Sequence, residues 1–200
     1  MHPAPQPVSR RERNKQAKLD RITAAARELF AEHGIDEVTT QQIAEKADIG
    51  AGTLFLYAKS KGELLLLVQN SAYADALAKG TAGAAEATAP LDAVMAIVRP
   101  VVECNRTQVE NGRTYLREMV FGDPNEPHHQ EALTLAAGTE SAIAEALQRG
   151  GRTSAATAAS LARTISAIMF LTMAASTNAS RSTDDLILHI RNQIAAILPA

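Results

Sequence analysis

Residues 39–64 read TTQQIAEKADIGAGTLFLYAKSKGEL, and this run constrains the fold more than any other part of the chain. Thr39 is a helix-capping residue, and Gln42 three positions later completes a capping box, so a short helix begins here. Residues 48–50, Asp-Ile-Gly, form a turn signal, and a second short helix is predicted over residues 51–58. Two short helices separated by a tight turn are typical of a helix-turn-helix.

The remainder of the chain also predicts helices. Apolar residues make up 46 % of the 200 residues, Trp is absent, and Ala and Leu are abundant, which favours helices over strands. Ser9 begins a first helix that ends at Gly34, and Ser60 begins a fourth helix that continues to about Lys79. Ala-rich segments predict five more helices, at about residues 91–109, 113–121, 129–149, 154–176 and 184–198. The expected fold class is therefore all-α with about nine helices.

Composition and turn signals divide the chain into parts. Residues 1–8 hold three prolines and predict a disordered N-terminal extension. Residues 9–79 form the expected helix-turn-helix domain, and residues 91–200 form a second helical domain. The segment between them, residues 80–90, is rich in small residues and predicts a linker. We expect a further break between helices at residues 111–112, an Asn-Gly pair.

The net charge of −2 hides an asymmetry along the chain. Residues 1–62 carry ten Lys or Arg against eight Asp or Glu, whereas residues 63–200 carry ten against fourteen. Residues 9–21 alone contain six basic side chains and two acidic ones. This distribution suits a protein that contacts phosphate at one end, although an ordinary solvated helix end has the same composition.

Other features limit the class of protein. The single cysteine, Cys104, excludes an internal disulfide and a cysteine-based metal site, and we expect it to pack as a small apolar residue. The N-terminal residues lack the apolar core of a signal peptide. The most apolar stretch, residues 165–175, is shorter than the roughly 20 residues that span a bilayer. A cytoplasmic protein without a membrane partner is expected.

The chain resembles the tetracycline-repressor (TetR) family of bacterial regulators over about residues 16–76, with the motif at residues 39–58. The residues that carry the resemblance stand at the family's spacing: Thr39-Thr40, Ile43-Ala44, Gly52-Thr53-Leu54, Lys61 and Leu64, with Ala25-Ala26, Leu29-Phe30 and Gly34 upstream. The resemblance implies an N-terminal three-helix helix-turn-helix domain that binds DNA. It also implies a C-terminal helical domain for ligand binding and dimerisation.

The resemblance also implies which residues contact DNA. Three positions would contact phosphate: Thr40, Tyr57 and Lys61. Five would face the bases: Gln41, Ala51, Gly52, Thr53 and Phe55. Among them Gln41 is the best candidate for a two-bond base contact, and adenine is its geometric match.

This sequence departs from the family's pattern within the motif. Gly50 lacks a hydroxyl that is common there, Phe55 replaces the usual Tyr, and Ala58 replaces the usual Phe. Residues 51–58 contain no Arg, Lys, Asn or Gln, so they offer methyl and ring contacts and the Thr53 hydroxyl. Phe55 either faces the bases or packs beneath Ala58 in place of the missing ring.

In the family the last two helices form a two-fold dimer through a four-helix bundle. The candidate interface residues here are apolar and lie on those two helices: Leu161, Ile165, Ile168, Leu186, Ile187, Ile190, Ile194 and Ile197. The alternative is that both helices fill the core of their own protomer.

The other C-terminal helices in the family enclose a pocket for a small, usually apolar effector. Pro100 would bend its helix and open space. The candidate lining residues are Met95, Arg99, Val102, Tyr115, Met119, Met169 and Met173. Methionines adapt to irregular spaces, but a methionine stripe also occurs in ordinary cores.

The expected function is that of a sequence-specific DNA-binding transcriptional regulator, a repressor released by an unidentified small-molecule effector. It would bind a two-fold symmetric operator in double-stranded DNA as a homodimer, without catalysis, cofactor or metal. One alternative is a dimeric helical interaction module without DNA binding. Another is a helical metal-binding or enzymatic protein that uses His128-His129 with Asp123, Glu126 and Glu131, although this spacing matches no standard zinc site.

Overall fold

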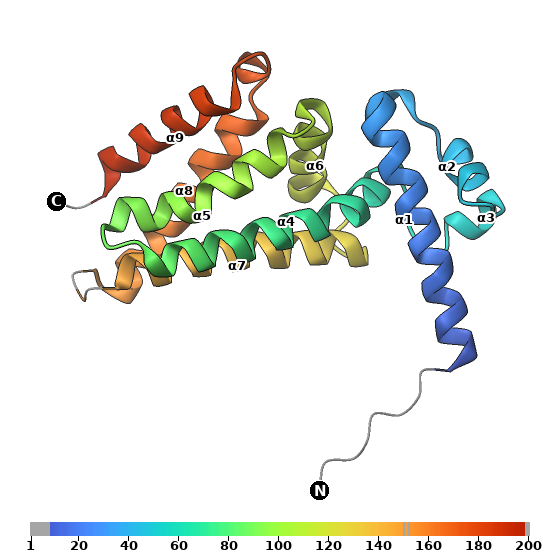
Figure 1. The fold of residues 1–200 in the computed structure, drawn as a ribbon, viewed down its shortest axis with the longest axis horizontal. Helices are drawn as coiled ribbons and strands as arrows, with labels where there is room; N and C mark the ends of the chain where they lie inside the picture. The colour runs from blue at the N-terminus through green and yellow to red at the C-terminus, as the bar shows by residue number, and fades with distance from the viewer. Residues whose placement is uncertain (1–8, 150, 152, 199–200) are drawn as a thin grey trace, which may run out of the picture.

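The structure, a computed structural model, describes residues 9–149, 151 and 153–198, and this part contains helices and no strand (Figure 1). The first four helices are α1 (Arg10–Glu37), α2 (Thr40–Lys46), α3 (Ala51–Leu54) and α4 (Lys61–Glu86). The others are α5 (Pro90–Arg106), α6 (Val109–Phe121), α7 (Pro127–Gln148), α8 (Ala155–Ala174), the 3-10 helix η1 (Ser176–Asn178) and α9 (Thr183–Ile197). The all-α prediction is confirmed. The predicted extension, residues 1–8, lies outside the described residues.

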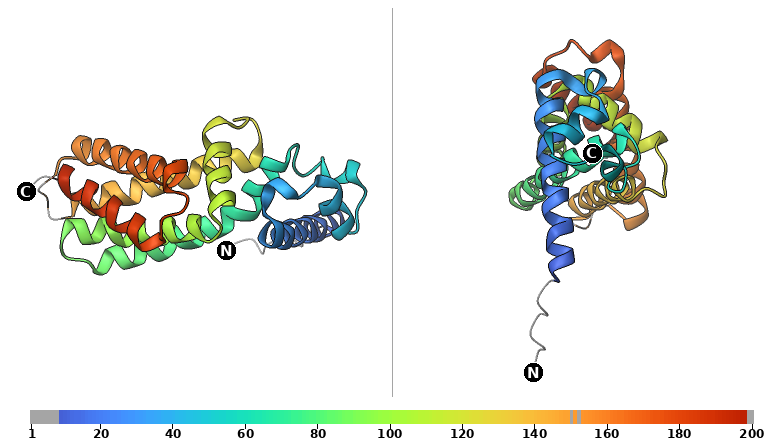
Figure 2. Two further views of the ribbon diagram at one scale, coloured as in Figure 1. Left: turned by 90° about the horizontal axis from the view of Figure 1, so that it is seen from above. Right: turned by 90° about the vertical axis from the view of Figure 1, so that its right-hand side faces the viewer.

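The molecule is elongated (Figure 2). Helices α1, α2 and α3 gather at one end, and α8 and α9 lie toward the other. Helix α4 runs from the first group into the second and packs along α5 and α7. A single long helix therefore connects the two parts of the molecule.

The first three helices form by the local signals that the sequence contains. Thr39 accepts a hydrogen bond from the Gln42 amide, and the Gln42 side chain accepts one from the Thr39 amide, which completes the predicted capping box. Gly34 has a φ of 76°, so it ends the regular part of α1 as predicted. In the turn, Asp48 adopts a φ of 54°, a conformation that Asp tolerates better than most residues.

Helix α3 is shorter than the predicted range of residues 51–58. It ends at Leu54, and the chain continues in tight turns through hydrogen bonds from the Leu56 amide to the Thr53 carbonyl and from the Tyr57 amide to the Leu54 carbonyl. Bonds that span three residues tighten the backbone beyond regular α geometry. Ala58 is buried and Phe55 is 45 % exposed, so Phe55 does not fill the space of the missing aromatic ring.

The predicted linker at residues 80–90 is mostly helical, because α4 continues to Glu86. The small residue at position 80 is explained by a close approach between α4 and α5. A Cβ atom at Gly80 would lie 2.8 Å from the Ile97 Cα and 3.1 Å from the Ala96 carbonyl oxygen. In a regular helix the amide of residue 100 would donate to the Ala96 carbonyl, but Pro100 has no amide hydrogen, so α5 lacks this bond. Glycine at position 80 therefore serves helix packing.

The predicted break at residues 111–112 is also wrong, since α6 begins at Val109. Asn111 is buried and joins α6 to α1: its Nδ2 donates to the Phe30 carbonyl, and its Oδ1 accepts from the Ile35 amide. These two backbone groups flank the kink at Gly34. The side chain therefore satisfies the backbone groups that the kink leaves open, and it fixes α6 to the helix-turn-helix part of the molecule.

Candidate functional site

The positions predicted to read bases lie at the surface of α2 and α3. Gln41, Gly52 and Phe55 are exposed, and Ala51 and Thr53 are partly exposed. Gln41 donates from Nε2 to the Glu45 carboxylate at 2.8 Å, so it would have to leave this partner to meet a base. The structure therefore leaves all five positions accessible from solvent.

The three predicted phosphate contacts differ in their surroundings. Thr40 is the first residue of α2 and is partly exposed, beside the free amides of the helix start. Tyr57 donates from its hydroxyl to the Lys15 carbonyl at 3.5 Å. Lys61 donates from Nζ to the carbonyls of Asp36 and Val38, at 3.2 and 3.0 Å. Lys61 therefore stabilises the segment after α1, a role that the sequence pattern does not indicate.

A basic groove of about 660 Å³ lies between the start of α1 and the residues that follow α3. Its lining residues are Arg10, Arg11, Asn14, Lys15, Lys18, Thr53, Leu56 and Tyr57. The exposed stretch of α1 that lines it projects away from the rest of the molecule (Figure 1). Within the described residues, no ion pair engages the four cationic side chains of this groove.

The basic side chains of residues 9–21 that line the groove thus lie beside Thr53, one of the candidate base-facing residues. The sequence showed the charge, but only the fold brings Lys15 and Lys18 beside Thr53 and Tyr57. Leu56, which sequence reasoning missed, is 83 % exposed in the same groove. Other nearby cations are paired: Arg21 lies 3.4 Å from Asp48, and Lys46 lies 2.8 Å from Glu28.

The second candidate site is a small apolar cavity of about 80 Å³ within the C-terminal helices. Four predicted residues line it, Tyr115, Met119, Met169 and Met173. Its other lining residues are Tyr73, Val101, Leu116, Ala132, Leu135, Ala136, Thr139, Ser166 and Phe170. No charged side chain is among them.

The remaining three predicted pocket residues do not line this cavity. Met95 and Val102 are buried in the core, whereas Arg99 is exposed. The Arg99 guanidinium lies 3.5 Å from Glu103 and 3.6 Å from Asp184. Arg99 therefore forms surface ion pairs, and the structure does not place these three residues at the cavity.

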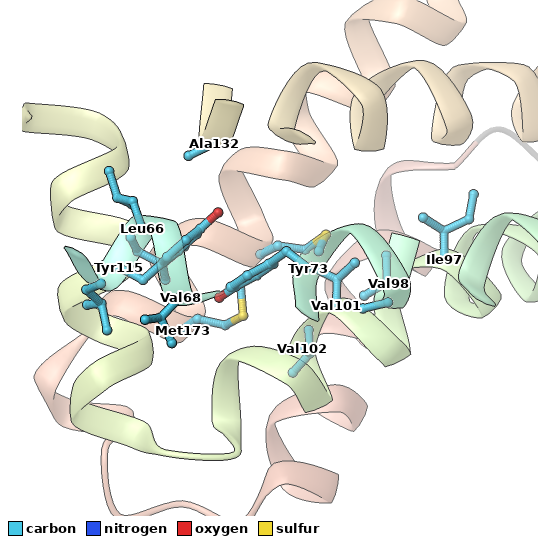
Figure 3. Close-up of a cluster of buried hydrophobic side chains, with 14 of the residues drawn as sticks. Leu66, Val68, Tyr73, Ile97, Val98, Val101, Val102, Tyr115, Ala132 and Met173 are labelled. Carbon is cyan, nitrogen blue, oxygen red and sulfur yellow. The ribbon is translucent and has the colours of Figure 1, made fainter. Parts of the chain in front are cut away.

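Two stacked tyrosines form one wall of the cavity (Figure 3). The rings of Tyr73 and Tyr115 are 4.2 Å apart between centroids and 11° from parallel. The Tyr115 hydroxyl donates to Asn70 Oδ1 at 2.9 Å, and Asn105 Nδ2 donates to the Tyr73 hydroxyl at 2.6 Å. Burial raises the pKa of both tyrosines above their usual range, so both hydroxyls stay neutral. The cavity is therefore suited to an uncharged group.

Most of the predicted dimer-interface residues lie inside the protomer. Ile165, Leu186, Ile187, Ile190 and Ile194 are at most 2 % exposed, and Leu161, Ile168 and Ile197 are partly buried against the same core. A side chain without exposed area has none to bury against a second protomer. The apolar stripe of α9 therefore packs within its own chain.

Exposed residues on the other faces of α8 and α9 are available instead. On α8 they recur at helical spacing: Ala156, Ser160, Arg163, Ala167 and Leu171. On α9 they include Leu188, Asn192 and Ala195.

Helix α8 is the one helix in the described part of the chain that is long and apolar enough to cross a membrane. The helix has 20 residues, and an 18-residue window of it has a mean hydropathy of 1.3. It packs against α6, α7 and α9, and Arg163 near its middle lies 3.9 Å from Glu140 of α7. These contacts are those of a core helix whose outer face is open.

The histidine region holds the junction between α4 and α7 together. His128 Nε2 donates to the Tyr57 carbonyl at 3.2 Å, and Glu63 accepts from the His129 amide at 2.9 Å. His128 thus bonds through its ring and His129 through its backbone amide, to different partners. Among the described residues, no three His, Cys, Asp or Glu side chains are grouped so that they could hold a metal ion.

Cys104 is half-buried and packs against the core, as the sequence predicts. Burial raises the pKa of its thiol to about 11, so the reactive thiolate is scarce at neutral pH.

The N-terminal part of the chain matches a known protein family. Residues 22–68 match the sequence profile described as bacterial regulatory proteins of the tetR family. An uncharacterised HTH-type transcriptional regulator of Haemophilus influenzae is 39 % identical over 54 residues, which cover 26 % of this chain and 29 % of that regulator. The chain thus matches less than a third of the length of this curated relative.

Solved structures share the whole fold at low identity. FadR from Thermus thermophilus, a TetR-family transcriptional repressor crystallised with lauroyl-CoA, superimposes with a TM-score of 0.70 at 21 % identity, over 91 % of this chain and 96 % of its own. A TetR transcriptional regulator from Rhodococcus sp. RHA1 gives 0.70 at 19 % identity, over 92 % and 97 %. BioQ, solved with its double-stranded DNA operator, gives 0.62 at 17 % identity, over 89 % and 98 %.

Proposed function

The N-terminal domain of this chain belongs to the tetR family of bacterial regulatory proteins, and on that premise we propose that the whole chain is a DNA-binding transcriptional repressor released by a small molecule. The observation that carries the proposal is the basic groove. It places four cations of α1 that form no ion pair among the described residues beside Thr53, Leu56 and Tyr57, at one end of the molecule.

In this proposal the groove holds the phosphate backbone while α2 and α3 read the bases. Cationic side chains supply most of the sequence-independent affinity for DNA, and base edges are read in the major groove. Gln41 reads a base, and Ala51, Thr53 and Phe55 contact thymine methyl groups, with Gly52 facing the bases beside them. Sequence-dependent DNA shape adds to the specificity. Thr40 and Tyr57 contact phosphate, with Lys61 adding charge where its bonds to the backbone allow.

The operator is read by a homodimer. The exposed faces of α8 and α9 form the interface, in place of the buried residues that the apolar pattern indicated. A two-fold interface of this kind uses the same surface on both protomers. It would cover the open side of α8, a helix too apolar to favour full contact with water.

The effector enters the cavity beside Tyr73 and Tyr115. FadR was crystallised with lauroyl-CoA, a ligand whose CoA part is charged and whose lauroyl chain is apolar, so only the acyl chain has the chemistry that this cavity accepts. The cavity of about 80 Å³ is smaller than the roughly 300–1,000 Å³ of typical ligand sites. An effector therefore favours a shape in which the C-terminal helices stand further apart, and its difference in affinity for the two shapes drives release from DNA.

The Asn111 contacts give this change a path to the headpiece. Tyr115 lines the cavity on α6, and Asn111 lies one helical turn before it, bonded to both sides of the kink in α1. A shift of α6 would move α1 with it. The chain acts by binding alone, in the cytoplasm where its DNA lies, without catalysis or a cofactor.

The basic groove is tested by removing charge from it. Lys15→Ala and Lys18→Ala should each weaken binding to every duplex sequence. Each should also reduce the slope of log affinity against log salt by roughly 0.9 for each phosphate that the protein no longer neutralises. Lys79→Ala, which removes an exposed cation from α4 outside both the groove and the proposed dimer interface, is the matched control and should leave the slope unchanged. An unaltered slope in both groove variants would remove the groove from the DNA interface.

A further inference from the structure

A polar pocket of about 240 Å³ lies where α4 begins, α6 ends and α7 begins. Its lining residues are Lys59, Ser60, Glu63, Leu66, Glu118, Gly122, Asp123, Glu126 and His129. It shares no lining residue with the basic groove or with the apolar cavity. The DNA and effector sites therefore leave this pocket without a role.

The pocket is acidic. Four carboxylates line it, those of Glu63, Glu118, Asp123 and Glu126, against the single ammonium of Lys59. Lys59 forms an ion pair with Glu126, and Glu118 lies 3.6 Å from Arg117, which is outside the lining. Among the described residues, Glu63 and Asp123 are in no ion pair, so a positive charge placed in the pocket would be attracted by both.

Three buried polar atoms of the lining have no hydrogen-bond partner: Glu63 Oε2, Glu126 Oε1 and His129 Nδ1. Glu126 Oε1 is in the ion pair with Lys59, so Glu63 Oε2 and His129 Nδ1 remain without any partner. Glu63 is only 5 % exposed and His129 only 3 %. The other carboxylate oxygen of Glu63 accepts from the His129 amide at 2.9 Å, so the side chain is held in place. Burial raises the pKa of Glu63. A buried acceptor without a donor is costly, and a ligand that donates to it recovers that cost.

The geometry favours an organic cation over a metal ion. No group of three potential metal ligands is arranged for coordination in the described part of the chain. An ammonium group instead needs hydrogen-bond acceptors and negative charge, and it can donate to a carboxylate oxygen and to an unprotonated imidazole nitrogen. The ion pair between Lys59 and Glu126 already places one ammonium group at this pocket.

We propose that this pocket binds a small organic cation with a primary ammonium group, which donates to Glu63 Oε2 and His129 Nδ1 and is attracted by Glu118 and Asp123. The volume is below that of sites for drug-sized ligands, so the ligand is a small amine. Bound there, it would join the first turn of α4 to the start of α7.

Titration of the DNA-free protein with methylammonium chloride, followed by amide chemical shifts, tests the site. The amides of Glu63 and His129 should shift and saturate. Tetramethylammonium chloride has the same charge but no N–H donor, and at equal ionic strength it should cause no saturating shift. Glu63→Gln should weaken methylammonium binding about tenfold or more, the loss expected when a charged hydrogen bond is removed.

Glu145→Gln is the matched control, because it removes an exposed carboxylate from α7 outside the pocket, and it should bind as the unaltered protein does. If Glu63→Gln does not fold, Glu118→Gln provides the same test at the rim of the pocket. Equal shifts with both cations, or affinity unchanged in both pocket variants, would overturn the proposal. So would saturating shifts with magnesium chloride in place of methylammonium, which would assign the pocket to a metal ion.

Discussion

Lys61 shows how a single side chain can serve the fold at a position predicted to serve DNA. Its ammonium donates to two backbone carbonyls, that of Asp36 in the last turn of α1 and that of Val38 between α1 and α2. The resemblance carried over only a phosphate contact, because a backbone partner 23 residues away leaves no local signal in the sequence. The phosphate contact stays a prediction, and the structural role can be tested without DNA.

Lys61→Ala should lower the free energy of unfolding by about 1–3 kcal/mol, since it removes hydrogen bonds from a charged donor to two carbonyls. Urea denaturation measures this. Lys79→Ala, which removes an exposed lysine from the same helix, should change the free energy of unfolding by less than about 0.5 kcal/mol. Equal stability of the two variants would mean that the Lys61 bonds contribute nothing to the fold.

At the scale of elements, the features of the helices that depend on neighbouring residues could be predicted from the sequence. The features that depend on distant contacts could not. The capping box of Thr39 and Gln42 and the end of the regular helix at Gly34 follow from local chemistry. Gly80 looked like a linker residue because only the folded chain places the backbone of α5 beside it. The stripe of α9 showed that Ile190 is apolar, but periodicity does not tell whether the same chain or a partner covers it.

The two glycines in the second half of α4 should respond oppositely to alanine. Gly80→Ala places a Cβ 2.8 Å from the backbone of α5 and should destabilise the protein by about 1–3 kcal/mol. At Gly83 a Cβ would meet the Ala96 Cβ at an ordinary 3.6 Å, so Gly83→Ala should stabilise it by about 0.5–1 kcal/mol. Thermal or urea unfolding of the pair decides the point. A tolerated alanine at position 80 would contradict the close packing of α4 on α5.

At the scale of the whole molecule, the proposal requires two protomers joined through exposed surface. Ile190→Asp cannot test this, because the side chain is fully buried and the variant would disrupt the protomer itself. Leu171 is 69 % exposed on α8, so a charge there leaves the core intact.

Leu171→Glu should therefore give a folded protein that sediments as a monomer, with unchanged helix content by circular dichroism and weakened DNA binding. Leu133→Glu adds the same charge to α7, where the leucine is 43 % exposed, and should remain a dimer. A dimer of undiminished strength in Leu171→Glu would place the interface elsewhere.

Selection of bound sequences from a random pool of duplex DNA tests whether this chain recognises a specific operator. A two-fold symmetric sequence should be enriched, with half-sites centred about one helical turn, or a multiple of it, apart. Binding to the enriched sequence should depend on Gln41 at one base pair in each half-site, at about 1–3 kcal/mol. A pool that stays random after repeated rounds, at salt concentrations low enough for binding, would contradict sequence-specific DNA recognition by this chain.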